Sequence, residues 1–171
     1  RSRPVTEQCC IGPEAVCATR EGNRIVIHGC TRAGQMDREG LAEIMGMDLE
    51  AIRVGPSACG GGFGSKLDVS FQPYVALAAW VLGRSARICY SRSESMRTST
   101  KRHPSDIRLT VGCDETGRIS GFVFDGIVNT GAYASWGPTV ANRVPIPASG
   151  PSATQDSRPN SIAAHALAPR H

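Results

Sequence analysis

A run of glycines in the middle of the chain is the stretch best suited to bind a ligand. Residues 59–66 read Cys-Gly-Gly-Gly-Phe-Gly-Ser-Lys. Glycine adopts positive φ and lets the backbone approach another group closely. A predicted strand over residues 51–54 precedes the run, and an apolar, helix-length stretch over residues 69–82 follows it. A glycine loop that opens a helix presents unpaired N–H groups, which favours an anionic or strongly polar ligand. A tight connection that needs only small residues explains the glycines equally well.

Two common phosphate-binding motifs do not fit this run. A Walker A loop needs Ser or Thr directly after its lysine, to hold magnesium, and Leu67 follows Lys66 here. A dinucleotide-binding fingerprint needs glycine where Ser65 stands. It also needs an acidic residue about 20 positions further on, where Ser85 and Ala86 are found. Both motifs are therefore excluded.

The run does resemble a different signature. Residues 60–66 are similar to the GGGFGGK motif of the molybdenum hydroxylases, the xanthine dehydrogenase and aldehyde oxidase family, in the molybdopterin-binding large subunit. Further segments resemble the same family in the same order, and the resemblance covers roughly residues 6–168. These segments are residues 13–15, Thr31, and residues 84–92, 100–104, 129–133 and 143–151.

The resemblance implies an oxidoreductase that hydroxylates an aldehyde or N-heteroaromatic carbon, with water as the oxygen source. It implies a molybdenum–pterin cofactor, either molybdopterin or its cytosine dinucleotide. Iron–sulfur clusters, and FAD where present, would be on partner subunits or domains in the cytoplasm. The implied cofactor-binding residues are Gly61, Gly62, Phe63, Gly64 and Arg32, with the Phe63 backbone beside the metal.

The same resemblance implies Arg143 and Leu67 as substrate-binding residues. It implies no catalytic residue within these 171 residues, since the family's base-supplying glutamate falls outside them. The chain alone is therefore expected to be inactive. Three positions depart from the family pattern: Arg32 replaces a glutamine, Leu67 replaces the glutamate of purine-hydroxylating members, and Gly12 replaces a glutamate. Because an apolar wall cannot bind polar ring edges, Leu67 disfavours a purine substrate.

Composition leaves two other interpretations open. Residues 84–108 contain seven Lys or Arg and only two acidic residues, which suits nucleic acid or an anionic cofactor but also a solvated face. Only Tyr90 interleaves with the arginines, so stacking on bases is poorly supported. The alternatives are a phosphate- or nucleic-acid-binding module built from the glycine loop and this basic segment, and an inactive truncated remnant.

The remaining composition is that of a globular protein. Hydrophobic residues make up 40% of the chain and charged residues 20%. No apolar run reaches the ~20 residues of a membrane span. The seven cysteines contain no CxxC pair, which disfavours a zinc ribbon or a cysteine-held cluster and favours reduced thiols in the cytoplasm.

Hydrophobic periodicity predicts an α+β fold, with a mixed sheet and packed helices. Expected strands cover residues 16–18, 24–28, 51–54, 87–90, 107–112 and 118–128, and expected helices cover residues 35–47 and 69–82. Turn residues at 22–23 and at 114–117 predict a hairpin of the first two strands and another of the last two, and Gly83 is suited to end the second helix. The second helix is apolar on most sides. We expect it to be buried on a sheet that includes strands 24–28 and 118–128. We expect residues 1–171 to form one partial domain of a longer subunit, with residues 145–171 irregular.

Overall fold

The computed structural model describes residues 2–3, 7–131, 133, 135–143 and 156–164. Contacts divide the chain into two compact units, one of Glu7–Lys101 and one that joins Arg1–Thr6 to Arg102–His171. That residues 1–171 form one partial domain of a longer subunit remains a prediction.

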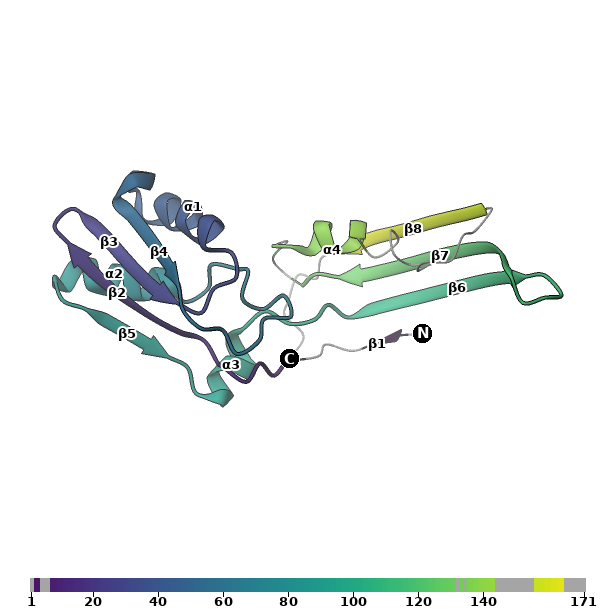
Figure 1. Ribbon diagram of the computed structural model, residues 1–171, viewed down its shortest axis with the longest axis horizontal. Helices are drawn as coiled ribbons and strands as arrows, with labels where there is room; N and C mark the ends of the chain where they lie inside the picture. The colour runs from purple at the N-terminus through teal and green to yellow at the C-terminus, as the bar shows by residue number, and fades with distance from the viewer. Residues whose placement is uncertain (1, 4–6, 132, 134, 144–155, 165–171) are drawn as a thin grey trace. The chain divides into compact units, whose positions relative to one another are not determined.

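The unit Glu7–Lys101 is built on a four-stranded mixed sheet with strand order β4-β3-β2-β5 (Figure 1). Strands β2 (Ala15–Glu21) and β3 (Arg24–Gly29) form the predicted hairpin, and Gly22 takes φ +61° at its turn. β4 (Ile52–Pro56) runs parallel to β3, and β5 (Ala86–Cys89) runs antiparallel to β2. The α+β class with a mixed sheet and packed helices is confirmed.

Two helices pack on one face of this sheet. α1 (Gly34–Met45) lies in the connection from β3 to β4, ahead of the short 3-10 helix η1 (Leu49–Ala51), and contacts β4. α2 (Gln72–Leu82) contacts β2, β3 and β5. The strand register places the apolar side chains of neighbouring strands on the same face, and these meet the helices in one core. Its buried residues are Val16, Ala18, Ile25, Ile27, Cys30, Leu41, Ile52, Phe71, Val75, Ala76 and Ala79.

Helix α2 ends at Leu82 as predicted but begins at Gln72, three residues after the expected start, and only one side of it is buried. Pro73 lies in the first turn, where its missing N–H costs least, and Gly83 ends the helix in a left-handed conformation. Val75 is 3% exposed, whereas Leu77 is 53% exposed. The expected burial on the sheet is therefore confirmed for the face that carries Val75, Ala76 and Ala79, and it does not extend to the opposite face, because the sheet covers a single face. The outward side chains are Tyr74, Leu77, Val81 and Leu82.

One further helix of this unit was not expected from the sequence. α3 (Arg92–Thr98) is short and opens with a capping box, in which the Ser91 hydroxyl accepts from the Glu94 N–H and the Glu94 carboxylate accepts from the Ser91 N–H. The Ser-x-x-Glu spacing was a usable start signal. Helix α3 was not predicted because it lacks a long apolar stripe. Its charged residues were interpreted as part of the basic segment instead.

The second unit has its own four-stranded sheet, with order β1-β6-β7-β8. β6 (Ser105–Cys113) and β7 (Ile119–Asn129) form the predicted hairpin. Its turn is closed by the Asp114 carboxylate, which accepts from the N–H groups of Thr116 and Arg118. β1 (Ser2–Arg3) pairs antiparallel with β6, and α4 (Gly137–Arg143) contacts β7 and β8.

Two expectations about this region are wrong. β7 does not join the sheet that contains β3, because β6 and β8 occupy both of its edges. Residues 145–171 are not irregular throughout, since Asp156–Ala164 forms β8, parallel to β7. Pro159 is tolerated there because β8 lies at the sheet edge, where a strand can spare an N–H. Residues 145–155 and 165–171 lie outside the described residues.

Within the described residues, every helix is too short or too polar to cross a membrane.

Candidate functional site

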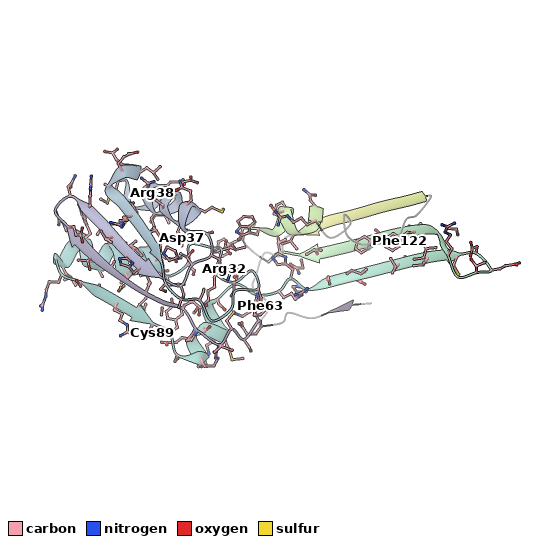
Figure 2. All side chains as sticks on the ribbon, viewed as in Figure 1. Arg32, Asp37, Arg38, Phe63, Cys89 and Phe122 are labelled. Carbon is pink, nitrogen blue, oxygen red and sulfur yellow. The ribbon has the colours of Figure 1, made fainter. Side chains whose placement is uncertain are left out.

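The glycine loop lies at the carboxyl end of β4, and Arg32 lies just past the carboxyl end of β3. Because these two strands are parallel, both segments emerge at the same edge of the sheet. Figure 2 labels Arg32 and Phe63 there. In open parallel α/β sheets, ligands characteristically bind beyond the carboxyl ends of the strands, and the parallel pair of β3 and β4 has this arrangement.

The loop backbone adopts conformations that favour glycine. Gly61 has φ +108° and Gly64 has φ +94°, and Phe63 between them has φ +49°. The turn closes where the N–H and the hydroxyl of Ser65 both donate to the Gly62 carbonyl, at 2.8 Å and 2.7 Å. A non-glycine residue at positive φ carries strain, and Phe63 keeps this conformation although its ring is 76% exposed.

Neighbouring segments hold both ends of the loop. At the start, the Gly12 N–H donates to the Gly60 carbonyl at 3.3 Å. At the end, the Arg32 N–H donates to the Lys66 carbonyl at 2.9 Å. The loop is thus tied to the segment before β2 and to the segment after β3.

The Lys66 side chain points into the protein. Its Nζ lies 2.6 Å from Glu14 Oε1, and the two side chains are 0% and 3% exposed. Burial raises the pKa of the Glu14 carboxyl, but hydrogen bonds from Lys66 and Ser95 outweigh burial and hold that pKa below its usual value. Lys66 is therefore not available to a phosphate, which removes the loop lysine from the phosphate-binding alternative.

The tip of the loop offers donors instead. Within the part of the chain that the structure describes, the N–H groups of Phe63 and Gly64 donate to no protein acceptor. The stem of the Arg32 side chain packs against Gly62, where an added Cβ would lie 3.3 Å from Arg32 Cγ. Arg32 is exposed, and it forms no ion pair with a described carboxylate. Backbone donors beside a cation suit an anionic or oxo-rich group.

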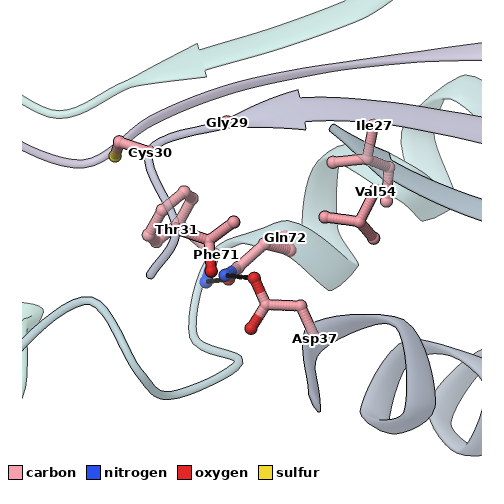
Figure 3. Close-up of a pocket in the computed structure, with 8 residues that line it drawn as sticks. All are labelled: Ile27, Gly29, Cys30, Thr31, Asp37, Val54, Phe71 and Gln72. Carbon is pink, nitrogen blue, oxygen red and sulfur yellow. Dashed lines mark hydrogen bonds between the residues drawn. The ribbon is translucent and has the colours of Figure 1, made fainter. Parts of the chain in front are cut away.

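A buried polar cluster of Asp37 and Gln72 lies beside Thr31, the residue before Arg32 (Figure 3). Gln72 Nε2 donates to Asp37 at 3.1 Å, and Gln72 Oε1 accepts from the N–H groups of Ser70 and Phe71. Burial raises the pKa of the Asp37 carboxyl above its usual value. The surrounding side chains leave no room for a water molecule. The cluster therefore joins α1 to the first turn of α2 and is no ligand site.

Among the predicted site residues, the structure brings Gly61, Gly62, Phe63, Gly64 and Arg32 together. Leu67 follows Lys66 directly and is partly exposed. Arg143 is exposed at the last position of α4 in the other unit.

Sequence reasoning missed the pairing of Glu14 with Lys66. The two residues are 52 positions apart, and no local pattern connects them.

The seven cysteines are all free. Cys10 approaches the loop, with Sγ 3.5 Å from Ser65 Oγ, and burial raises the pKa of the Cys59 thiol. The described residues contain no cluster of three or more His, Cys, Asp or Glu placed to hold a metal ion. Any ligand at the loop would therefore be bound mainly by backbone groups and Arg32.

The basic segment over residues 84–108 does not form one continuous cationic element. It is divided between the two units at Lys101. The Arg92 guanidinium donates to the Cys10 and Ile11 carbonyls, and Lys101 pairs with Glu7 at 2.6 Å. Two cationic side chains of the segment, Arg92 and Lys101, thus bind groups of the protein itself.

Similar proteins were found in both curated sequences and solved structures. The chain is 36% identical to a probable xanthine dehydrogenase subunit of Bacillus subtilis, over 80% of this chain and 18% of that protein. It is 34% identical to the nicotinate dehydrogenase large molybdopterin subunit of Eubacterium barkeri, over 71% of this chain and 28% of that subunit. The chain thus spans less than a third of the length of either relative.

A solved structure shares the fold: the aldehyde oxidoreductase of Desulfovibrio gigas matches with a TM-score of 0.88 at 18% identity, over 96% of this chain and 18% of that one. The family model described as the molybdopterin cofactor-binding domain matches residues 3–159. The chain therefore belongs to the molybdopterin cofactor-binding domain family, within the xanthine dehydrogenase and aldehyde oxidase group of molybdenum enzymes.

Proposed function

We propose that this chain forms part of the molybdenum–pterin site of an oxidoreductase that hydroxylates an aldehyde or N-heteroaromatic carbon with oxygen from water. The observation that carries the proposal is the exposed turn at Phe63 and Gly64, whose two N–H groups have no acceptor among the described residues, in a member of this family. Relatives named for xanthine and for nicotinate support a heteroaromatic substrate. An aldehyde oxidoreductase that shares the fold is compatible with the broader substrate range.

The loop fits the cofactor by the chemistry of its donors. The backbone of Gly61, Gly62 and Gly64 carries no side chain that would block a ligand. The Phe63 and Gly64 N–H groups are positioned before the ligand arrives, so they cost little reorganisation when they stabilise oxygen atoms. Arg32 adds a permanent positive charge that suits an anionic pterin. When bound, the molybdenum–pterin group supplies the two-electron redox chemistry of hydroxylation.

Substrate selection is assigned to Leu67 and Arg143. Leu67 follows the buried Lys66 and is partly exposed, which gives an apolar wall in place of a carboxylate. Arg143 is exposed, and its guanidinium offers a fork of donors to a carboxylate or carbonyl. An apolar side chain at residue 67 favours a substrate with an apolar body, and the guanidinium at residue 143 favours a substrate with one anionic or carbonyl group. An aromatic aldehyde or a heteroaromatic carboxylate meets this description.

Oxidation of such a substrate requires a route for electrons out of the site. We assign this route to iron–sulfur clusters, with a flavin where present, on partner subunits or domains in the cytoplasm.

The proposal is tested on the whole protein. We expect molybdenum in near-stoichiometric amount by mass spectrometry, and ¹⁸O from labelled water in the product of an aromatic aldehyde or nicotinate. Gly64→Ala should lower molybdenum content and turnover, because alanine resists φ +94° at the loop tip. Gly83→Ala is the matched control, since Gly83 also has positive φ and open space around it but caps α2. Absence of both molybdenum and ¹⁸O incorporation would overturn the proposal.

A further inference from the structure

Glu14 and Lys66 form a buried ion pair that ends the glycine loop (2.6 Å). We propose that this pair positions the loop for its ligand and that stability is not its main contribution. The inference rests on the proposed function for the identity of the ligand. Its main readout, amide exchange in the protein without cofactor, does not depend on the identity of the ligand.

The first argument is energetic. Removing two charges from water costs several kcal/mol for each ion, and their mutual attraction often only offsets this cost. Replacing a buried ion pair with apolar residues of similar size is frequently neutral or stabilising. Stability alone therefore does not account for a pair that is 0% and 3% exposed. A fixed, directional contact does account for it.

The second argument concerns what the pair connects. The Glu14 carbonyl accepts from the Tyr90 N–H at 2.8 Å, and the next residue, Ala15, begins β2. Glu14 is thus fixed to the sheet. Lys66 also accepts the Arg32 N–H at its carbonyl. The pair therefore ties the end of the loop to the sheet. Because the Lys66 carbonyl accepts from the Arg32 N–H, the pair also fixes the position of Arg32 beyond the end of β3.

The third argument concerns strain within the loop. Between the contact at Gly60 and the contacts at Lys66 lie five residues, three of which have positive φ. Phe63 is the non-glycine among them, and such a conformation persists only where the surrounding structure imposes it. The Phe63 ring is mostly exposed and provides little packing. The restraint must therefore come from the Ser65-to-Gly62 hydrogen bonds that close the turn and from the two ends of the loop, Gly60 and Lys66, each three residues from Phe63.

The chain contains a matched control pair. Lys101 and Glu7 are also 2.6 Å apart, but they are 23% and 14% exposed, and Lys101 is 35 positions beyond Lys66. No hydrogen bond joins either of them to the described residues of the glycine loop. Replacing this pair tests the general effect of removing an ion pair from the same unit.

The experiment compares the double variant Glu14→Met/Lys66→Met with Glu7→Met/Lys101→Met in the whole protein, prepared without cofactor. Urea unfolding gives stability, and amide hydrogen exchange reports the Arg32 and Ser65 N–H groups, which donate to Lys66 and Gly62. The Met47 N–H at the end of α1 is the reference amide. Molybdenum content is then measured after cofactor loading.

We expect the Glu14/Lys66 double variant to keep its urea midpoint within about 0.5 M of wild type, because apolar replacement of a buried pair is close to neutral. The Arg32 and Ser65 amides should exchange at least about tenfold faster, a change equivalent to ~1.4 kcal/mol of local opening. Molybdenum content should fall. The control variant should leave all three measurements unchanged.

If the double variant keeps wild-type exchange at Arg32 and Ser65, the positioning role is wrong. If the midpoint falls and Met47 exchange rises by the same factor, the pair is a stabilising contact only, and the proposal is also wrong. Glu14→Asp covers the case of a double variant that does not fold, because it keeps the charge and shortens the side chain by one methylene. Unchanged exchange in Glu14→Asp would likewise contradict the proposal.

If the double variant exchanges faster but the wild-type protein contains no molybdenum after cofactor loading, the positioning role is retained and the proposed function is rejected. The two failures are therefore distinguishable.

Discussion

Replacing Gly60 with alanine tests whether the glycine loop and the segment before β2 depend on close backbone contact. A Cβ at residue 60 would lie 2.6 Å from the Gly12 nitrogen and 3.1 Å from the Gly12 Cα. Both are backbone atoms that cannot rotate away. Overpacking of this kind costs about 1–3 kcal/mol, and loss of the Gly12-to-Gly60 hydrogen bond costs about 0.5–1.5 kcal/mol. We expect Gly60→Ala to destabilise the protein by about 2–4 kcal/mol.

Gly62→Ala is the matched control, because both residues lie in the loop and neither has positive φ. A Cβ at residue 62 would lie 3.3 Å from Arg32 Cγ, and this exposed, flexible side chain can move. The expected cost is within about 0.5 kcal/mol, as for other surface substitutions. Urea unfolding at an m value of about 2 kcal/mol/M should therefore show a midpoint shift of about 1–2 M for Gly60→Ala only. Equal shifts for the two variants would refute the argument from backbone contact.

Three other outcomes are expected. Because the Asp37 pKa is raised, its stabilising contribution is full below the unfolded pKa and is lost as pH rises through the folded pKa. Asp37→Asn should flatten this decline in urea midpoint above about pH 4, and an unchanged slope would contradict it. The purified 171-residue chain should bind no molybdenum–pterin tightly, since it spans less than a third of the two relatives described above; stoichiometric metal by mass spectrometry would refute this. Leu67→Glu in the whole enzyme should move kcat/KM for xanthine relative to an aromatic aldehyde by roughly tenfold to a hundredfold, from a hydrogen-bond partner worth about 1.5–3 kcal/mol; an unmoved ratio would show that Leu67 does not line the pocket.

The elements that local signals define were predicted well. The turn at Gly22, the cap at Gly83 and the alternation in β7 each act within a few residues. The assignment of β7 to the same sheet as β3 failed because it depends on strand pairing. Pairing partners such as Phe124 and Pro159 are far apart in sequence, and no local pattern selects them. Burial of α2 was predicted and holds for one face only, since composition does not report how many faces a sheet covers.

The candidate site shows a similar division. Residue type permits positive φ at Gly61 and Gly64 but does not select these two glycines, since Gly60 and Gly62 in the same loop do not have it. Phe63 also has positive φ, and this could not be predicted because such a conformation is uncommon for a non-glycine residue and depends on the surrounding structure. The residue most easily misassigned is Lys66. In a Walker A loop the lysine at the end of the glycines reaches a phosphate, whereas here it reaches Glu14.

The geometry of the turn explains this difference and indicates how the loop would work. The N–H and hydroxyl of Ser65 both close on the Gly62 carbonyl, and the next side chain, Lys66, enters the core. Backbone donors and the exposed ring of Phe63 are what the loop itself then presents at its tip. Ligand binding at such a loop depends on backbone conformation more than on side-chain chemistry. Substitutions that alter φ at Gly61 or Gly64 should therefore weaken ligand binding more than Phe63→Leu does, because Phe63→Leu keeps the same N–H groups.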